Sequence, residues 1–357
     1  MRDEEMSGKV VTVLGPIAPE DLGITLPHEH ILIDTRMYFM EPKTMGDRKR
    51  AYEPIRLENL NWVLHNIYRS YDNLLLDDEI LATQELLAFK HAGGRTVVDM
   101  TPQSTGRDPD ALLRLSRATG LNIVMGTAYY SEASYSQGDM GARTEENIAR
   151  EFARDILEGV GFFKVRSGII GELGCTWPLK PNERKVLIAG AIAQQQTGAA
   201  INIHPGRNEK APLEIIQVLK ESGADLARTV ISHMDRCSYL LENRLAMLEA
   251  GCFIEYDLFG TYGYYPAEVS MPEGQLPDQM NDTQRIREII ELINLGWLSK
   301  ILISHDIGFK FRLQSYGGPG YAHILNNAVP MMKVYGMTDA QIRTIIIDNP
   351  RTLLTLK

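Results

Sequence analysis

Eight short segments rich in Val, Ile and Leu alternate with helical segments along most of this chain, and this alternation constrains the fold most strongly. Near-continuous apolar runs of this kind are typical of parallel strands buried on both faces. Glycine follows several of the helical segments, as at Gly120, Gly198 and Gly251. The expected strands lie around 26–30 and at 96–100, 122–126, 168–173, 200–204, 229–233, 252–256 and 300–306. The order predicts a parallel sheet covered by helices.

Eight such units in 357 residues favour an α/β fold of the closed (β/α)8 TIM barrel type over an open doubly wound sheet. No glycine motif for binding dinucleotides or phosphates follows any of the segments. Because no domain boundary is evident, we expect a single domain over residues 1–357, with a short N-terminal β extension at 9–23. A stretch from 35 to 72 is rich in Met and Tyr and lacks clean periodicity. We expect it to fold over the mouth of a pocket.

The composition excludes several functional classes. With 44% hydrophobic and 23% charged residues, the chain reads as an ordinary globular protein. A formal charge of −9 argues against nucleic acid or an anionic membrane as the main partner. No apolar run approaches the ~20 residues of a membrane span, and the first residues lack the apolar core of a signal peptide. Three scattered cysteines fit a reducing compartment, so we expect a cytoplasmic protein.

Side chains that bind metals recur at the carboxyl ends of the predicted strands. Residues i and i+2 of a strand point to the same side, so the two histidines of the first strand can converge on one ion. In a TIM barrel the carboxyl ends of all eight strands surround one active site. The candidate metal ligands are His28, His30, Glu172, His204, His233 and Asp306.

Each candidate also has an ordinary structural explanation. A lone His204 or His233 on an apolar strand is often only a buried, hydrogen-bonded side chain. Asp306 could cap a helix, and Glu172 could pair with a basic residue. These explanations would have to hold separately at five strand ends, whereas one metal centre accounts for all of them. The pattern therefore predicts a metal site.

The number of ligands predicts two divalent metal ions. Four histidines and two carboxylates exceed the needs of one tetrahedral ion and suit a pair with a shared carboxylate. We expect His28, His30 and Asp306 to hold one ion, His204 and His233 to hold the other, and Glu172 to bridge them. Imidazole and carboxylate ligands favour Zn²⁺, with Mn²⁺, Fe²⁺ or Co²⁺ as alternatives.

The arrangement resembles the amidohydrolase superfamily and, more narrowly, the phosphotriesterase-related branch of the phosphotriesterase family. The likeness runs from about Gly8 to the C-terminus. It rests on the stretches IGELGCTWPL at 170–179, IHPGRN at 203–208, SHMDR at 232–236, EYDLFG at 255–260 and YGG at 316–318. Phosphotriesterases proper bridge their metals with a carboxylated lysine on the fourth strand. Glu172 closes that strand here, which implies a glutamate bridge and weakens organophosphate hydrolysis as the native task.

The expected reaction is hydrolysis. A hydroxide shared by two metals would attack a carbonyl polarised by the ion on His204 and His233, and Asp306 would carry the proton to the leaving group. The resemblance implies that the substrate is N-acetyltaurine, a small anionic N-acyl amino-sulfonate that yields taurine and acetate. A lactonase or phosphoester hydrolase with the same centre is the alternative. A catalytically inactive metal-binding scaffold is more remote, because the ligand set is complete.

A sulfonate requires a cation in the pocket, and several basic residues follow the candidate ligands. For each of them a surface or loop role is about as plausible, and packing is the simpler role for each tyrosine. The candidate substrate contacts are Arg207, Arg236, Lys310, Arg312, Tyr129, Tyr130 and Tyr262. The sequence leaves open the oligomeric state, with a homodimer as one option.

Overall fold

The computed structural model describes residues 6–135, 139–237, 240–265 and 278–357. Eight parallel strands form one sheet in the order β14-β11-β10-β9-β8-β7-β6-β3. Val97 of β6 pairs with Ile123 of β7, and Ile203 of β9 pairs with Ile231 of β10. The strands are β3 (Thr25–Glu29), β6 (Thr96–Asp99), β7 (Asn122–Thr127), β8 (Ile169–Gly174), β9 (Ile201–His204), β10 (Thr229–Ile231), β11 (Phe253–Tyr256) and β14 (Ile301–Ile303).

The first and last strands meet through hydrogen bonds beside the candidate site. The backbone N–H of Asp306 donates to the carbonyl of His28 over 3.2 Å, and the N–H of His28 donates to Ser304 Oγ over 3.1 Å. The Glu29 carboxylate accepts from the Ser304 hydroxyl and the His305 backbone N–H. The sheet is thereby nearly closed, which confirms the predicted (β/α)8 fold.

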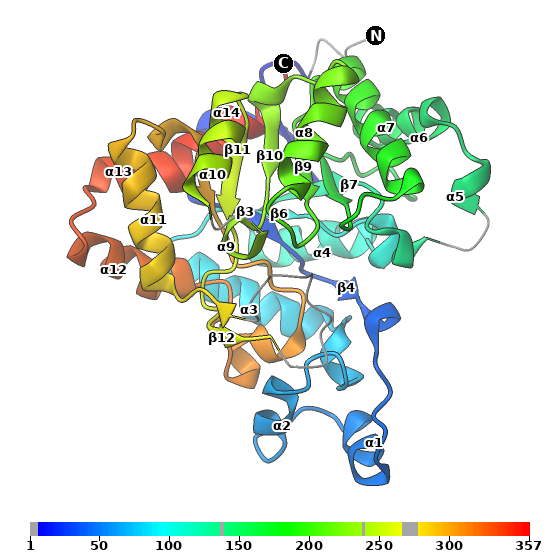
Figure 1. Ribbon diagram of the computed structural model, residues 1–357, viewed down its shortest axis with the longest axis vertical. Coiled ribbons are helices and arrows are strands. Elements are labelled where there is room, and N and C mark those ends of the chain that lie inside the picture. The colour runs from blue at the N-terminus through cyan, green and yellow to red at the C-terminus, as the bar shows by residue number, and fades with distance from the viewer. Residues whose placement is uncertain (1–5, 136–138, 238–239, 266–277) are drawn as a thin grey trace.

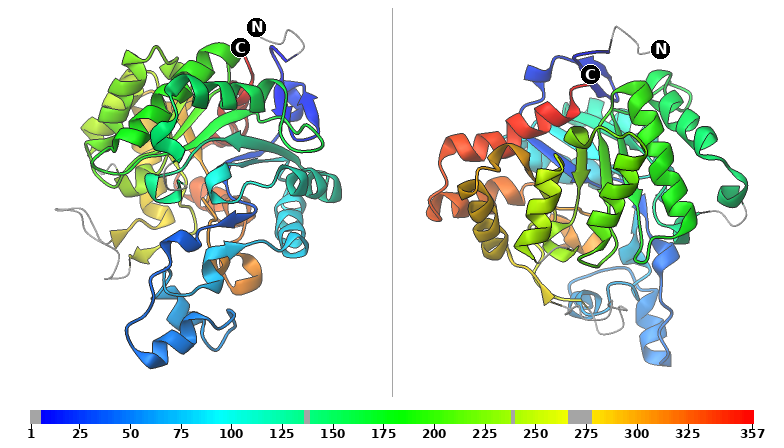
Figure 2. Two further views of the ribbon diagram at one scale, coloured as in Figure 1. Left: turned by 90° about the vertical axis from the view of Figure 1, so that its right-hand side faces the viewer. Right: turned by 45° about the horizontal axis from the view of Figure 1, so that its top comes forward.

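Helices surround the sheet, as Figure 2 shows. In α4 the Asp108 side chain accepts from the Ala111 N–H, and Gly120 ends the helix with a φ of 67°. These are the start and stop signals expected of a helix between two strands. The helices are α1 (Met45–Ala51), α2 (Leu60–Leu64), α3 (Glu79–His91), α4 (Pro109–Thr119), α5 (Asp139–Ala142), α6 (Glu145–Leu157), α7 (Pro181–Thr197), α8 (Ala211–Glu221), α9 (Met234–Cys237), α10 (Leu241–Glu249), α11 (Asp282–Asn294), α12 (Val329–Val334), α13 (Asp339–Arg343) and α14 (Asn349–Leu354).

The region at 9–23 contains an antiparallel hairpin of β1 (Val10–Thr12) and β2 (Gly15–Ile17). It packs on the barrel, where the Val13 N–H donates to the Ile123 carbonyl over 2.8 Å. The two described ends of the chain also meet, because the Gly8 N–H donates to the Leu356 carbonyl over 2.9 Å.

The stretch from 35 to 72 lies at the opposite end of the barrel from the termini (Figure 1). It carries α1 and α2 and follows β4 (Ile33–Asp34), which pairs with β5 (Leu75–Leu76). Tyr38 and Tyr68 from this stretch line the central cavity, as the expected cover of a pocket mouth would. Two further short strands, β12 (Gly263–Tyr264) and β13 (Asp278–Gln279), pair with each other and contribute residues to the wall of the same cavity. No helix among the described residues is long and apolar enough to cross a bilayer.

Candidate metal centre

The structure brings all six predicted ligands together at the carboxyl ends of the strands. Asp306 Oδ1 lies 3.2 Å from His30 Nε2 and 3.8 Å from His28 Nε2. On the other side, His204 Nδ1 and His233 Nε2 are 2.8 Å apart. These form two candidate ligand groups, His28–His30–Asp306 and Glu172–His204–His233, in each of which the ligand atoms lie within 4.8 Å of one another.

Glu172 lies between the two groups. Its Oε1 is 2.8 Å from His204 Nδ1, 2.8 Å from His233 Nε2 and 3.4 Å from His28 Nε2. Its Oε2 is 3.9 Å from His30 Nε2. One carboxylate therefore reaches both groups, as the bridging role requires.

Three of the candidate ligands lie beyond their strands. We expected His30, His233 and Asp306 to close the strands around 26–30 and at 229–233 and 300–306, but β3 ends at Glu29, β10 at Ile231 and β14 at Ile303. His233 has a φ of 60° and Asp306 a φ of 52°, in the left-handed region that residues other than glycine rarely occupy. This turn of the backbone, rather than strand alternation, directs the two side chains into the cluster. Such strain is common at functional sites.

The donor set fits bound cations. His28 Nε2 is buried and has no hydrogen-bond partner among the described residues. The close approach of His204 Nδ1, His233 Nε2 and Glu172 Oε1 gathers lone pairs at one point, where a cation would satisfy them together. A third group, His28–His233–Asp257, also has metal-binding geometry. Asp257 was not among our predicted ligands.

Burial opposes the charged form of every imidazole in the site, but the nearby carboxylates outweigh it and raise the pKa of His28, His30 and His233, so His204 is the exception. Burial, aided by the charge of Arg236, lowers the pKa of His204 to about 3 despite the nearby Glu172. A neutral imidazole is the form that coordinates a metal. Burial alone would raise the pKa of Glu172, but the imidazoles of His204 and His28 hold it well below its usual range. Similarly, burial would raise the pKa of Asp306, but the hydrogen bond from His30 and the charges of His233 and His28 together lower it.

A layer of polar residues behind the ligands was missed by the sequence reasoning. His28 Nδ1 lies 3.1 Å from Glu255 Oε2, and His233 Nδ1 lies 2.7 Å from Asp257 Oδ1. Thr101 Oγ1 lies 3.1 Å from His30 Nδ1. Partners of this kind fix the tautomer and the orientation of a ligating imidazole. The detectable signal was the pair Glu255 and Asp257, two acids spaced i, i+2 at the end of an apolar strand.

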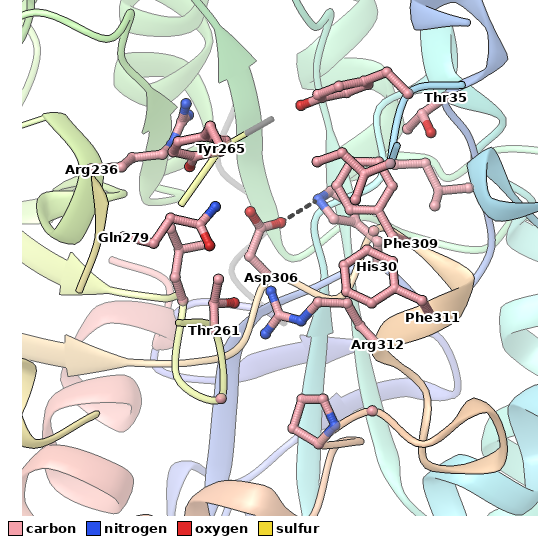
Figure 3. Close-up of a pocket in the computed structure, with 18 of the residues that line it drawn as sticks. His30, Thr35, Arg236, Thr261, Tyr265, Gln279, Asp306, Phe309, Phe311 and Arg312 are labelled. Atoms are coloured by element: carbon pink, nitrogen blue, oxygen red, sulfur yellow. Dashed lines mark ion pairs between the residues drawn. The ribbon is translucent and has the colours of Figure 1, made fainter. Parts of the chain in front are cut away.

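A cavity of about 1280 Å³ opens above the cluster, and its wall is mainly apolar and aromatic. Figure 3 shows His30 and Asp306 at its base, with the aromatic rings of Phe309 and Phe311 to one side and Tyr265 on the other. A pocket with an apolar wall and a few convergent polar groups is typical of a small-molecule site.

The predicted substrate contacts divide into two sets. Arg207, Arg236, Arg312, Tyr130 and Tyr262 line the cavity. Arg236 is nearly buried, with Nη2 2.7 Å from His204 Nε2, and the Tyr130 hydroxyl lies 3.0 Å from His204 Nδ1.

Lys310 and Tyr129 lie elsewhere and correct our expectation for these two residues. Lys310 Nζ pairs with Asp72 Oδ1 over 2.6 Å, which holds the ammonium group to the stretch before β5. The Tyr129 hydroxyl donates to Glu151 on α6 over 3.1 Å. Neither is among the residues that line the cavity, so we do not include them in the proposed substrate site.

Comparison with known proteins relates the whole chain to one family. The model of the phosphotriesterase family matches residues 8–354. Proteins from Dictyostelium discoideum and Xenopus tropicalis, both named N-acetyltaurine hydrolase, are each 43% identical to this chain, with 99% of both chains covered in each comparison. The crystal structure of a resiniferatoxin-binding protein from Rhodobacter sphaeroides matches with a TM-score of 0.92 at 33% identity, covering 97% of this chain and 95% of that chain. Because the matches extend over the barrel and every candidate ligand, this chain is an enzyme of the phosphotriesterase family, a family of hydrolases.

Proposed function

We propose that this enzyme is a metal-dependent amidohydrolase that converts N-acetyltaurine into taurine and acetate. The observation that carries the proposal is the cluster of six candidate ligands, of which His30, His204 and Asp306 line the cavity. The names of its relatives support the choice of substrate.

The two ligand groups would hold two divalent ions. His28, His30 and Asp306 would hold one, His204 and His233 the other, and Glu172 would contact both. We propose Zn²⁺ first, with Mn²⁺, Fe²⁺ or Co²⁺ as alternatives. When bound, such ions polarise a carbonyl and acidify water.

Asp306 is the group that we propose moves the proton. It lines the cavity, and at 22% exposure its side chain is the most accessible of the six candidate ligands. Its lowered pKa keeps the carboxylate ionised, as a base must be. Asp306 would take a proton from the attacking water and give it to the nitrogen of the departing taurine. The Tyr130 hydroxyl, which also lines the cavity, would face the acyl group.

The test offers the metal-loaded enzyme N-acetyltaurine, an aliphatic lactone and an aryl phosphotriester. We expect kcat/KM to be highest for N-acetyltaurine, and Asp306→Asn and Glu172→Ala to lose turnover by at least about 1,000-fold because each removes a group that acts in the reaction. Asp339→Asn is the control, since this carboxylate is exposed and, among the described residues, forms an ion pair only with Lys333.

A preference of several orders of magnitude for the lactone or the phosphotriester would replace the amidase assignment with one of those alternatives. An absence of turnover with every substrate, in a protein that retains its metals, would indicate the inactive scaffold.

We further propose that the enzyme works in the cytoplasm, because its three cysteines are free and buried. A homodimer stays a prediction, and light scattering on the eluting protein would test it.

A further inference from the structure

The three arginines that line the cavity differ in the contacts of their guanidinium groups. Arg207 lies over the ring of Tyr265, 3.9 Å from its centroid. Arg236 reaches the Nε2 atom of His204. Arg312 has no comparable contact with a side chain among the described residues.

Arg312 is a buried guanidinium that forms no close ion pair in the part of the chain that the structure describes, and Asp306, Glu29 and Asp282 favour its charge only from a greater distance. Only 4% of the residue is exposed, and no described carboxylate lies within 4.0 Å of its nitrogens. Nη2 donates to the Phe259 carbonyl over 2.9 Å, whereas Nε is buried and finds no hydrogen-bond partner in the described ranges. Taking an unpaired charge out of water is costly, so an anion that enters this part of the cavity would be favoured.

The guanidinium points into the cavity close to the reacting centre. In Figure 3 it lies beside Asp306 and Thr261, with Gln279 across the gap. The Thr261 hydroxyl is a second buried polar group without a hydrogen-bond partner among the described residues. Arginine next to a hydroxyl is suited to a tetrahedral anion, which offers several oxygens as acceptors.

The loop that carries Arg312 is built around glycines. The Gly320 N–H donates to the Arg312 carbonyl over 3.0 Å, and the Gly318 N–H donates to the Leu313 carbonyl over 2.9 Å. A Cβ atom on Gly318 would lie 2.3 Å from the Arg312 backbone, so only glycine allows the chain to turn back so closely. The YGG motif at 316–318 therefore has a physical role in positioning Arg312.

Resting on the proposed function, we propose that Arg312 binds the sulfonate of the substrate and sets specificity for anionic N-acyl amides. In an extended N-acetyltaurine, the sulfur lies about 5 Å from the carbonyl carbon, since four bonds join them. The sulfonate would thus be held on the Arg312 side of the cavity while the amide faces Asp306. The Thr261 hydroxyl would donate a second hydrogen bond to it.

The test compares N-acetyltaurine with its neutral primary sulfonamide, which has the same length and nearly the same shape. The readout is the ratio of the two kcat/KM values, which does not depend on the fraction of active enzyme. We expect the wild-type enzyme to prefer the sulfonate, and Arg312→Gln to reduce this ratio by about 10- to 100-fold, the range for loss of a charged hydrogen bond, mainly through KM. Arg312→Lys should keep part of the preference because it keeps the charge. Calorimetric binding of propane-1-sulfonate gives a second readout that needs no turnover, and it should weaken in parallel.

The outcomes separate the two proposals. If the wild-type enzyme hydrolyses N-acetyltaurine and Arg312→Gln keeps its preference for the anion, this inference is wrong and the proposed function stands. The same holds if Arg207→Gln or Arg236→Gln, rather than Arg312→Gln, removes the preference. If the enzyme hydrolyses neither amide, the proposed function fails, and the binding of propane-1-sulfonate alone decides whether Arg312 is the anion site. Should Arg312→Gln fail to fold, Arg312→Lys carries both measurements, and an unchanged ratio and affinity in it would contradict the inference.

Discussion

Replacing Glu255 by Gln should weaken metal binding although Glu255 is not itself a predicted ligand. Its Oε2 accepts from Ser232 Oγ over 2.9 Å and from Asn202 Nδ2 over 3.1 Å, and lies 3.1 Å from His28 Nδ1. Both donors and the imidazole are buried, so the carboxylate is the group that keeps a proton on Nδ1 and leaves Nε2 for a metal. An amide of the same shape removes the negative charge and brings an NH₂ group among these donors.

The expected loss of metal affinity is about 10- to 100-fold, equivalent to about 1.4–2.8 kcal/mol. The assay dialyses wild-type and Glu255→Gln protein against a graded series of chelator-buffered Zn²⁺ and measures bound metal by mass spectrometry. Half-occupancy should shift by one to two decades of free Zn²⁺ in the variant, and activity should return when more metal is added.

Asp155→Asn is the control for loss of a buried carboxylate as such. Asp155 is as buried as Glu255 but bonds Arg107 and Thr127, away from the ligands. This variant should lower the free energy of unfolding without moving the metal titration. A folded Glu255→Gln protein that binds Zn²⁺ with wild-type affinity would refute the reasoning, because His28 would then not depend on its buried partner.

Three further predictions concern the metal content, the pH dependence of stability and the glycine loop. Removing metal with a chelator should abolish turnover. It should also lower the free energy of unfolding by about 4 kcal/mol relative to a sample with free metal at 1,000 times its Kd. Calorimetric melting before and after metal is restored measures this change in stability. Burial would raise the pKa of Asp282, but hydrogen bonds from His323 and from the Gly260 N–H lower it below its usual 3.8, so its contribution to stability is complete at higher pH and is lost as pH falls through the folded pKa. The difference in urea stability between wild type and Asp282→Asn should therefore shrink from about pH 5 to pH 3, and a constant difference would contradict this sign. Gly318→Ala should raise KM for N-acetyltaurine more than for its neutral sulfonamide, since the added Cβ must displace the backbone of Arg312.

The barrel and the set of metal-binding residue types gathered at its carboxyl end could be predicted from the sequence because both rest on short-range patterns. Apolar runs mark strands buried on both faces, and the polar side chains of the active face lie at the end of each run or one or two residues after it. His204 illustrates this, since it is the last residue of β9 and needs no further information to be placed. The grouping around Glu172 also followed, because every strand end of a barrel faces one centre.

Contacts between distant parts of the chain could not be predicted in this way. Lys310 follows Asp306 closely, but its charge is taken up by Asp72, a residue 238 positions away in the sequence. Arg312, only two residues later, is turned into the cavity by the glycine loop behind it. Because both cations lie close to Asp306 in the sequence, they appeared equivalent. In the structure a remote carboxylate pairs with Lys310, whereas the glycine loop directs Arg312 into the cavity.

Glu29, the last residue of β3, lies between His28 and His30 and anchors the end of the last strand. Glu29 accepts from the backbone N–H groups of His305 and Ile307 over 2.9 and 3.1 Å, and also lies 2.7 Å from His305 Nδ1. Asp306 is the single residue between these two anchored groups, and it takes the left-handed φ of 52° that directs its carboxylate toward His30. The tripeptide 28–30 therefore does two things at once. Its histidines present imidazoles to the candidate metal site, and the intervening carboxylate fastens the last strand so that the proposed proton carrier reaches the same point. Because alternation along a strand places Glu29 away from the site, this role becomes evident only when the barrel is closed.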